Sequence, residues 1–219
     1  MNTNSIYGEY AEYLEMVLQD LEKRFKNFDD YVLGETGEHG FEHIITRIKS
    51  DESMREKCQR KGLPETPHSA LSELTDAIGM RIVTSFVDDI YLMIKYIKSF
   101  DNCEVIEEID YIKHAKPNGY RSYHLILAVK TDYPDVNGNT PGTYYVEIQL
   151  RTIALDTWAS LEHKIRYKKD LPPELADELY DELLECALLS TDLDLRMQSI
   201  RTRLDDTGLY ASPHFGANL

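Results

Sequence analysis

The sequence has few cysteines and no long apolar run, and both features exclude large classes of protein. Its three cysteines, Cys58, Cys103 and Cys186, lie far apart with no Cys-x-x-Cys pair, so we expect reduced thiols rather than a disulfide framework or a zinc site. No uninterrupted apolar stretch is long enough to span a bilayer, and residues 1–12 are too polar for a signal peptide. The default expectation is a cytoplasmic protein with no membrane partner.

Basic residues are also scarce relative to acidic ones. The 219 residues include 24 Lys and Arg against 39 Asp and Glu, a formal net charge of −15. Such a chain repels a long polyanion unless its bases gather on one face. The net charge therefore does not indicate RNA binding, although clustered bases would permit it, and it is compatible with a small nucleotide in a basic cleft.

Hydrophobic periodicity predicts a mixed α/β sheet flanked by helices, with helical extensions at both ends of the chain. At 42% hydrophobic and 29% charged residues, the chain can bury one sizeable core. The expected helices cover residues 10–28, 51–61, 88–99, 154–167 and 173–204. The expected strands cover residues 44–49, 79–84, 123–129 and 144–150, with another near Val105. We expect a loop at 34–40 and an irregular tail at 210–219.

Residues 116–124 read Lys-Pro-Asn-Gly-Tyr-Arg-Ser-Tyr-His and combine cations, a turn and an aromatic ring. Lys116 and Arg121 can meet phosphate, Asn118-Gly119 favours positive φ, and Tyr120 offers a flat ring. A hairpin turn between residues 109–111 and the strand at 123–129 is the alternative. Charge and aromatic content favour a nucleotide-binding loop.

Two acids are placed to share a cation. In the strand at 144–150, alternation puts Glu147 and Gln149 on one face with Tyr145 and Arg151, opposite the apolar side chains. Asp76 precedes the apolar run 77–83, a second strand of the core. Magnesium is usually held by one or two carboxylates plus substrate phosphates. The alternatives are a merely solvated strand face for Glu147 and a helix cap for Asp76.

Several ordered blocks together resemble the RelA/SpoT-type synthetases of the alarmone (p)ppGpp, in particular their single-domain members, the small alarmone synthetases. The resemblance covers nearly the whole chain. Its blocks are Arg47-Ile48-Lys49, Lys57 with Arg60, residues 76–81, residues 116–124, residues 146–152 and residues 158–164. It implies a nucleotidyltransferase-like fold, with an N-terminal helix and loop at 1–40, a synthetase core at 41–168, and a C-terminal helical extension and tail at 169–219.

The resemblance also implies an activity: Mg²⁺-assisted transfer of the β,γ-pyrophosphate of ATP to the ribose 3′-hydroxyl of GDP or GTP, with release of AMP. Asp76 and Glu147 resemble the metal ligands, and Glu147 resembles the residue that helps to deprotonate the hydroxyl. A carboxylate bound to a cation is a weaker base, so the two roles of Glu147 conflict. The ATP site would comprise Arg47, Lys49, Lys57, Arg60 and Arg81. The GDP or GTP site would comprise Lys116, Tyr120, Arg121, His124 and Gln149.

The positions of these residues in the expected strands and helices agree with the assignments, but purely structural roles are the alternatives. Arg47 and Lys49 alternate onto one strand face, and Lys57 and Arg60 lie three apart on one side of a helix. Exposed helical lysines are usually just solvated. His124 would otherwise be a strand histidine bonded to a backbone carbonyl.

The resemblance leaves the acceptor, the activity and the assembly to be tested. The chain has no His-Asp dipeptide, which the family's hydrolase domain requires, so we expect synthesis without hydrolysis. Residues 107–110 read Glu-Glu-Ile-Asp and match neither charge signature that accompanies GTP or GDP preference. A toxic branch of the family that pyrophosphorylates the 3′ end of tRNA is the second reading. A catalytically silent nucleotide sensor or RNA-binding module is the third.

The last helix predicts a homo-oligomer. It carries an apolar stripe and, if continuous to Leu204, spans roughly 45 Å, more than one side of a small domain needs. The stripe comprises Leu175, Leu179, Leu183, Ala187, Leu193, Met197, Ile200 and Leu204. We expect part of it to meet another subunit, and small alarmone synthetases are homotetramers. An intramolecular core helix is the alternative.

Overall fold

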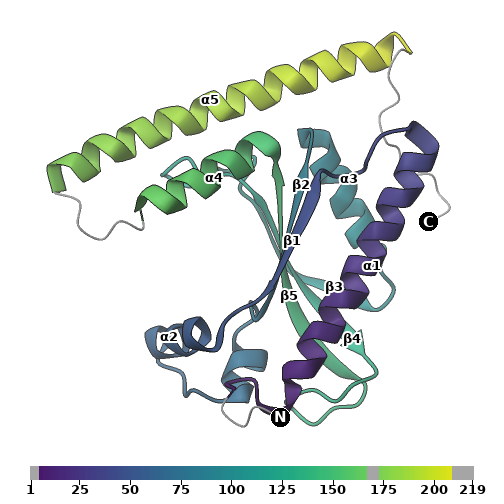
Figure 1. Cartoon of the computed structure of the whole chain (residues 1–219), viewed down its shortest axis with the longest axis vertical. Helices are drawn as coiled ribbons and strands as arrows, with labels where there is room; N and C mark the ends of the chain where they lie inside the picture. The colour runs from purple at the N-terminus through teal and green to yellow at the C-terminus, as the bar shows by residue number, and fades with distance from the viewer. Residues whose placement is uncertain (1–4, 167–172, 209–219) are drawn as a thin grey trace.

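Alternating apolar side chains build a five-stranded mixed sheet at the centre of the computed structural model, which describes residues 5–166 and 173–208 (Figure 1). The strand order is β1-β2-β5-β4-β3. Strands β2 and β5 are parallel, and every other neighbouring pair is antiparallel. The strands are β1 (His43–Ile48), β2 (Ile78–Thr84), β3 (Cys103–Asp110), β4 (Tyr123–Thr131) and β5 (Gly142–Thr152). The predicted mixed α/β fold is confirmed.

The helices lie on both faces of this sheet. They are α1 (Ala11–Thr36), α2 (Asp51–Lys61), α3 (Val87–Ile97), α4 (Ile153–Arg166) and α5 (Pro173–Asp206), with short helical turns at Gly8–Tyr10 and Ser69–Glu73. Figure 1 shows α1 and α3 on one side of the sheet and α2 and α4 on the other, with α5 crossing beside α4. Four of the five predicted helices match to within a few residues, whereas α1 continues eight residues beyond the predicted end at residue 28. Tyr167 and the predicted tail at 210–219 lie outside the described residues.

The two faces of β5 differ in polarity, and this difference positions the site. Val146, Ile148 and Leu150 are fully buried in one core with side chains of α1 and α3. Between them, Glu147 and Gln149 point to the other face and are partly exposed. The strand alternation read from the sequence is therefore confirmed, and the polar face lies toward α2 and α4.

One local prediction needs correction, and one alternative reading does not apply. Helix α1 runs through Gly34 to Thr36, so the predicted loop begins later than expected; Gly37, with φ of 77°, ends the helix by donating its N–H to the carbonyl of Leu33. A glycine inside a helix costs only about 1 kcal/mol, and the packing of α1 outweighs that cost. The alternative of a helix cap for Asp76 does not apply, because Asp76 lies two residues before β2 and its side chain contacts lysines.

The segment 111–122 does connect two antiparallel strands, β3 and β4, as the hairpin alternative proposed. Its turn is closed by a hydrogen bond from the Gly119 N–H to the Lys116 carbonyl, and Gly119 has φ of 86°. At twelve residues, this connection is longer than a tight hairpin. It leaves room for the side chains that the sequence assigns to a ligand.

Helix α5 is continuous, as predicted, and docks on the core through a polar seam. Ala187, Asp194 and Arg201 are buried at seven-residue intervals. The carboxylate of Asp194 accepts a hydrogen bond from the Thr152 hydroxyl at 2.7 Å. The guanidinium of Arg201 pairs with Asp89 of α3 at 2.6 Å. These bonds fix α5 against the carboxyl end of β5 and the start of α3.

No helix in the described part of the chain is both long and apolar enough to cross a bilayer. Cys58, Cys103 and Cys186 are free thiols, as predicted. Burial raises the pKa of the Cys103 thiol to about 11, which keeps it protonated and unreactive.

Candidate active site

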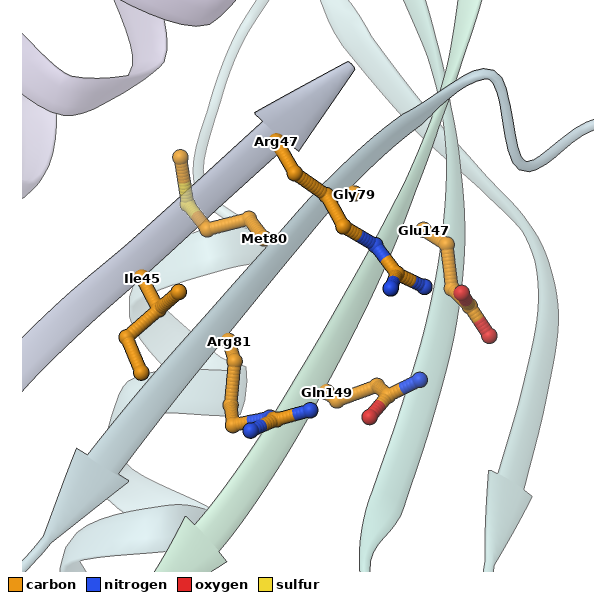
Figure 2. Close-up of a pocket in the computed structure, with 7 residues that line it drawn as sticks. All are labelled: Ile45, Arg47, Gly79, Met80, Arg81, Glu147 and Gln149. Carbon is orange, nitrogen blue, oxygen red and sulfur yellow. The ribbon is translucent and has the colours of Figure 1, made fainter. Parts of the chain in front are cut away.

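The polar face of the sheet brings predicted side chains of three strands together. In the register, Gly79 of β2 pairs with Glu147 of β5, and Arg81 pairs with Gln149. Figure 2 shows Arg47 and Glu147 converging near Gly79, with Arg81 and Gln149 side by side in the same pocket. Cations that the sequence assigns to ATP and polar groups of β5 therefore share one surface.

Gly79 leaves the space that Arg47 occupies. A Cβ at this position would lie 3.3 Å from Arg47 Nε and 3.4 Å from its Cγ, closer than most contacts of that kind. The guanidinium can therefore lie across β2 toward Glu147. The sequence analysis did not assign this role to Gly79, because it depends on how β1 packs beside β2.

Asp76 is held by two of the predicted lysines. Lys49 Nζ contacts Asp76 Oδ2, and Lys57 Nζ lies 2.5 Å from the same oxygen. Burial opposes the charge on this carboxyl, but the two ammonium groups outweigh it and lower its pKa. The other oxygen, Oδ1, is buried and has no hydrogen-bond partner among the described residues. Asp76 is therefore ionised and has a free acceptor.

Glu147 faces the same cavity as Asp76. Lys57, Asp76, His124 and Glu147 all line it. His124 Nδ1 lies 3.5 Å from Glu147 Oε1, and the imidazole lowers the pKa of Glu147 despite its burial. The two carboxylates thus line one cavity, and their sharing of a cation stays a prediction.

The donor set fits magnesium better than a metal held by protein ligands alone. Within the described ranges, no group of three His, Cys, Asp or Glu side chains is arranged to hold a metal. Two carboxylates, one with an unpartnered buried oxygen, match a cation that takes its remaining ligands from water and substrate phosphates.

The connection between β3 and β4 places an aromatic ring and a cation at the edge of the site. The Tyr120 hydroxyl lies 2.8 Å from His124 Nε2. Lys116 Nζ lies 4.9 Å from the Tyr120 ring centroid and 4.5 Å from that of Tyr111, within cation–π range. Tyr120, His124 and Lys116 are therefore one cluster, joined to Glu147 through His124.

Five predicted residues line neither cavity. Lys49 still contacts Asp76, and Lys116 and Tyr120 belong to the cluster with His124, but the other two lie apart from these groups. Arg121 donates to the backbone carbonyl of Ile112, and Arg60 is exposed on α2. Neither lines the pocket of Arg47 and Gln149 or the cavity of Asp76 and Glu147.

Two further charged residues contact the site, and the sequence analysis assigned no role to either. Arg151 is buried at the end of β5, and its Nη1 lies 2.9 Å from Asp156 Oδ1 in α4. Arg81 Nη1 lies 3.3 Å from the same oxygen. Alternation placed Arg151 on the polar face, but no sequence spacing indicated that Asp156 returns to it.

Comparisons with known proteins identify relatives of this chain. The family described as "Region found in RelA / SpoT proteins" matches residues 46–171. The GTP pyrophosphokinase YwaC of Bacillus subtilis is 40% identical over 171 residues, covering 77% of this chain and 78% of the relative.

Two solved structures from the same organism are similar over most of the fold. The small alarmone synthetase 1 of Bacillus subtilis bound to its product pppGpp has a TM-score of 0.75 at 29% identity, covering 87% of this chain and 94% of that one. The small alarmone synthetase 2 has a TM-score of 0.73 at 36% identity, covering 87% and 95%. The chain described here belongs to the RelA/SpoT family and is similar to its small alarmone synthetases.

Proposed function

We infer that the protein is a GTP pyrophosphokinase, which transfers the β,γ-pyrophosphate of ATP to the ribose 3′-hydroxyl of GDP or GTP, releases AMP, and so makes the stringent-response alarmone (p)ppGpp. The observation that supports this most is the meeting of Asp76 and Glu147 in one cavity, between lysines on one side and Tyr120 with His124 on the other. In the reaction the acceptor oxygen attacks the β-phosphorus, and the bond from that phosphorus to the α,β-bridging oxygen breaks. The electron pair leaves on AMP.

The donor side uses the cations on β1, β2 and α2. Arg47 and Arg81 flank the adenine, and Lys49, Lys57 and Arg60 hold the phosphates. Lys49 and Lys57 now neutralise Asp76, and bound phosphate oxygens compete for the same ammonium groups. Phosphoryl-type transfer needs mainly alignment and charge neutralisation, which these side chains supply.

Asp76 and Glu147 would hold Mg²⁺, which would supply neutralisation of phosphate charge and acidification of a nearby hydroxyl. The lowered pKa of Glu147 makes its carboxylate a weak proton acceptor. We therefore assign Glu147 chiefly to metal binding and charge, with removal of the 3′-hydroxyl proton as a secondary role.

The acceptor side uses the connection between β3 and β4. Tyr120 stacks on the guanine, a contact that contributes about 1–3 kcal/mol. Lys116, Arg121, His124 and Gln149 lie along the phosphates and ribose of GDP or GTP. Arg121 must leave the Ile112 carbonyl to do so.

The assembly is a homo-oligomer, and we propose a homotetramer in the cytoplasm. The buried residues of α5 include Ala187, Asp194 and Arg201, whereas many of its large apolar side chains are exposed. The exposed set on α5 is Leu175, Tyr180, Leu188, Leu189, Leu193, Leu195, Met197, Ile200 and Leu204. A surface of this kind is typical of a protein interface.

The decisive test is incubation with β,γ-labelled ATP and Mg²⁺, adding GDP, GTP or total tRNA separately and resolving the products. We expect label on GDP or GTP, and their relative rates give the acceptor preference. Label on tRNA alone would support the toxin reading, which the names of the relatives do not favour. Label on neither would leave the silent sensor.

A further inference from the structure

A buried guanidinium lies beneath the ring that we assign to the acceptor base. Arg151 Nη2 lies 2.9 Å from the Tyr120 hydroxyl and 2.9 Å from Gln149 Oε1. Its Cζ lies 5.2 Å from the centre of the Tyr120 ring. Only 5% of the Arg151 side chain is exposed, so substrate reaches Tyr120 before it reaches Arg151.

The counter-ion of Arg151 also serves the donor side. Asp156 Oδ1 lies 2.9 Å from Arg151 Nη1 and 3.3 Å from Arg81 Nη1. Arg81 lines the pocket with Arg47 that we assign to adenine. One carboxylate, 15% exposed, therefore holds an arginine of each nucleotide subsite.

The contacts form a continuous path across the site. It runs from Arg81 through Asp156 and Arg151 to Tyr120, and the Tyr120 hydroxyl continues to His124 at 2.8 Å. Charge-assisted bonds between largely buried groups are stronger and more directional than exposed ion pairs. Displacing Arg151 would leave Asp156 paired with Arg81 alone and the Tyr120 hydroxyl bonded to His124 alone, so each group would lose a charge-assisted bond.

We propose that Arg151 and Asp156 are positioning residues that couple the two nucleotide subsites, so that a base seated against Arg81 fixes the ring of Tyr120 for the acceptor. The inference rests on the proposed function, because it takes the ligands of the two subsites from it. Neither residue contacts the reacting atoms. By linkage, a donor that tightens acceptor binding is itself tightened by the acceptor by the same factor.

The test measures binding rather than turnover. Calorimetry with Mg²⁺ gives the Kd of GDP alone and at saturating α,β-methylene-ATP. This analogue cannot react, because a methylene group replaces the α,β-bridging oxygen and the bond from it to the β-phosphorus does not break. For the wild type we expect the analogue to lower the Kd of GDP at least about fivefold, the lower end of typical couplings. The reverse titration should give the same factor.

Three variants remove the path at different points. Asp156→Asn keeps the shape and removes the shared charge, Arg151→Lys keeps the charge and removes the fork, and Tyr120→Phe keeps the ring and removes the hydroxyl. In each, the coupling should fall below about twofold while the Kd of the analogue alone changes less than about threefold. The KM for GDP at saturating ATP should rise more than kcat falls. Asp20→Asn, which removes an exposed ion pair with Arg24 on α1, should retain the wild-type coupling.

A wild type that binds the two nucleotides independently would overturn the coupling, as would folded variants that keep the wild-type factor. If Arg151→Lys does not fold, Tyr120→Phe decides, because it leaves the ring and the buried ion pair in place. The labelled-ATP assay separates this inference from the proposed function. Coupled binding without label transfer would reject the enzyme and keep the path, and label transfer without coupling would do the reverse.

Discussion

Asp76 has two chemically different oxygens. Oδ2 is shared by two ammonium groups, while Oδ1 is buried without a partner among the described residues. An unpartnered buried acceptor costs about 1–3 kcal/mol, so a cation or water that reaches Oδ1 is favoured. The buried, unpartnered oxygen destabilises the fold, and a ligand bound at Oδ1 would offset that cost.

Replacing either carboxylate should abolish synthesis without unfolding the protein. Asp76→Asn and Glu147→Gln preserve shape but remove a charge from the cation site, and losing a metal ligand should cost several kcal/mol of transition-state stabilisation. In the labelled-ATP assay we expect each variant to form less than about a tenth of the wild-type product, because even the smallest expected cost of losing a metal ligand lowers the rate by that much. Circular dichroism would report an unchanged fold.

Glu65→Gln is the matched control, because Glu65 is a carboxylate bonded to Arg55 and Gln59 outside the site. It should retain wild-type activity. If Asp76→Asn or Glu147→Gln kept more than about a tenth of the activity, the metal site would be assigned wrongly.

The sequence correctly predicts the place of individual residues where that place follows from strand alternation. Glu147 and Gln149 share a face with Arg81 because β2 and β5 are both regular strands. Asp156 was missed because its place depends on how α4 turns back over the end of β5. No periodicity within one element contains that information.

The connection between β3 and β4 packs directly against α5. At Gly119, a Cβ would lie 2.5 Å from the Ala187 Cβ and 3.1 Å from Leu184 Cδ1. Close by, Trp158 of α4 donates from Nε1 to the Leu183 carbonyl at 2.8 Å. The turn that carries Tyr120 is therefore packed directly on α5, and no residue larger than glycine fits without moving one of them.

Gly119→Ala should weaken acceptor binding beyond the cost of its backbone conformation. Positive φ costs a residue with a Cβ roughly 1–2 kcal/mol, and the overlap with Ala187 must also be relieved by moving the loop. We expect a lower midpoint in urea unfolding and a raised KM for GDP, with the KM for ATP little changed.

Gly138→Ala isolates the backbone cost. Gly138 has φ of 82° but no atom within 4 Å of a built Cβ. The free energy of unfolding of this variant should fall by about 1–2 kcal/mol, and its KM for GDP should be unchanged. Equal effects of the two substitutions on stability and on KM would show that the contact with α5 is unimportant.

The buried ion pair between α5 and α3 should dominate the docking of α5. Arg201 is 3% exposed, pairs with Asp89, and lies over the Phe86 ring. Arg201→Met would leave the Asp89 carboxylate buried without its charge partner, a loss of about 3–5 kcal/mol in the free energy of unfolding. Urea denaturation monitored by circular dichroism measures it.

An exposed pair on the same helix provides the comparison. Arg196 and Asp192 are 76% and 56% exposed, so Arg196→Met should change stability by less than about 1 kcal/mol. A loss for Arg201→Met no larger than this would mean that α5 docks by other contacts.

For the molecule as a whole, the sequence predicted the length of α5 but treated its apolar residues as one stripe. The structure divides them. Leu183 and Ala187 pack against Trp158, whereas Leu193, Met197 and Ile200 are exposed. The buried seam farther along the helix is instead Asp194 and Arg201, charged residues that a hydrophobicity pattern assigns to solvent. Their burial follows from specific partners on other elements, which periodicity cannot identify.

Because α5 buries charged residues and exposes apolar ones, its exposed apolar face is the surface that a second copy of the chain should cover. Leu193 is 53% exposed and Ile200 is 50% exposed, on a helix that already buries its polar side. Replacing both in Leu193→Glu/Ile200→Glu would place charges in an apolar interface and should convert the oligomer into monomers, as measured by light scattering. Met16→Glu on α1, at a comparably exposed apolar position, should leave the mass unchanged. A wild type that is monomeric at working concentration would remove the oligomer, and an oligomer that survives the double substitution would place its interface elsewhere.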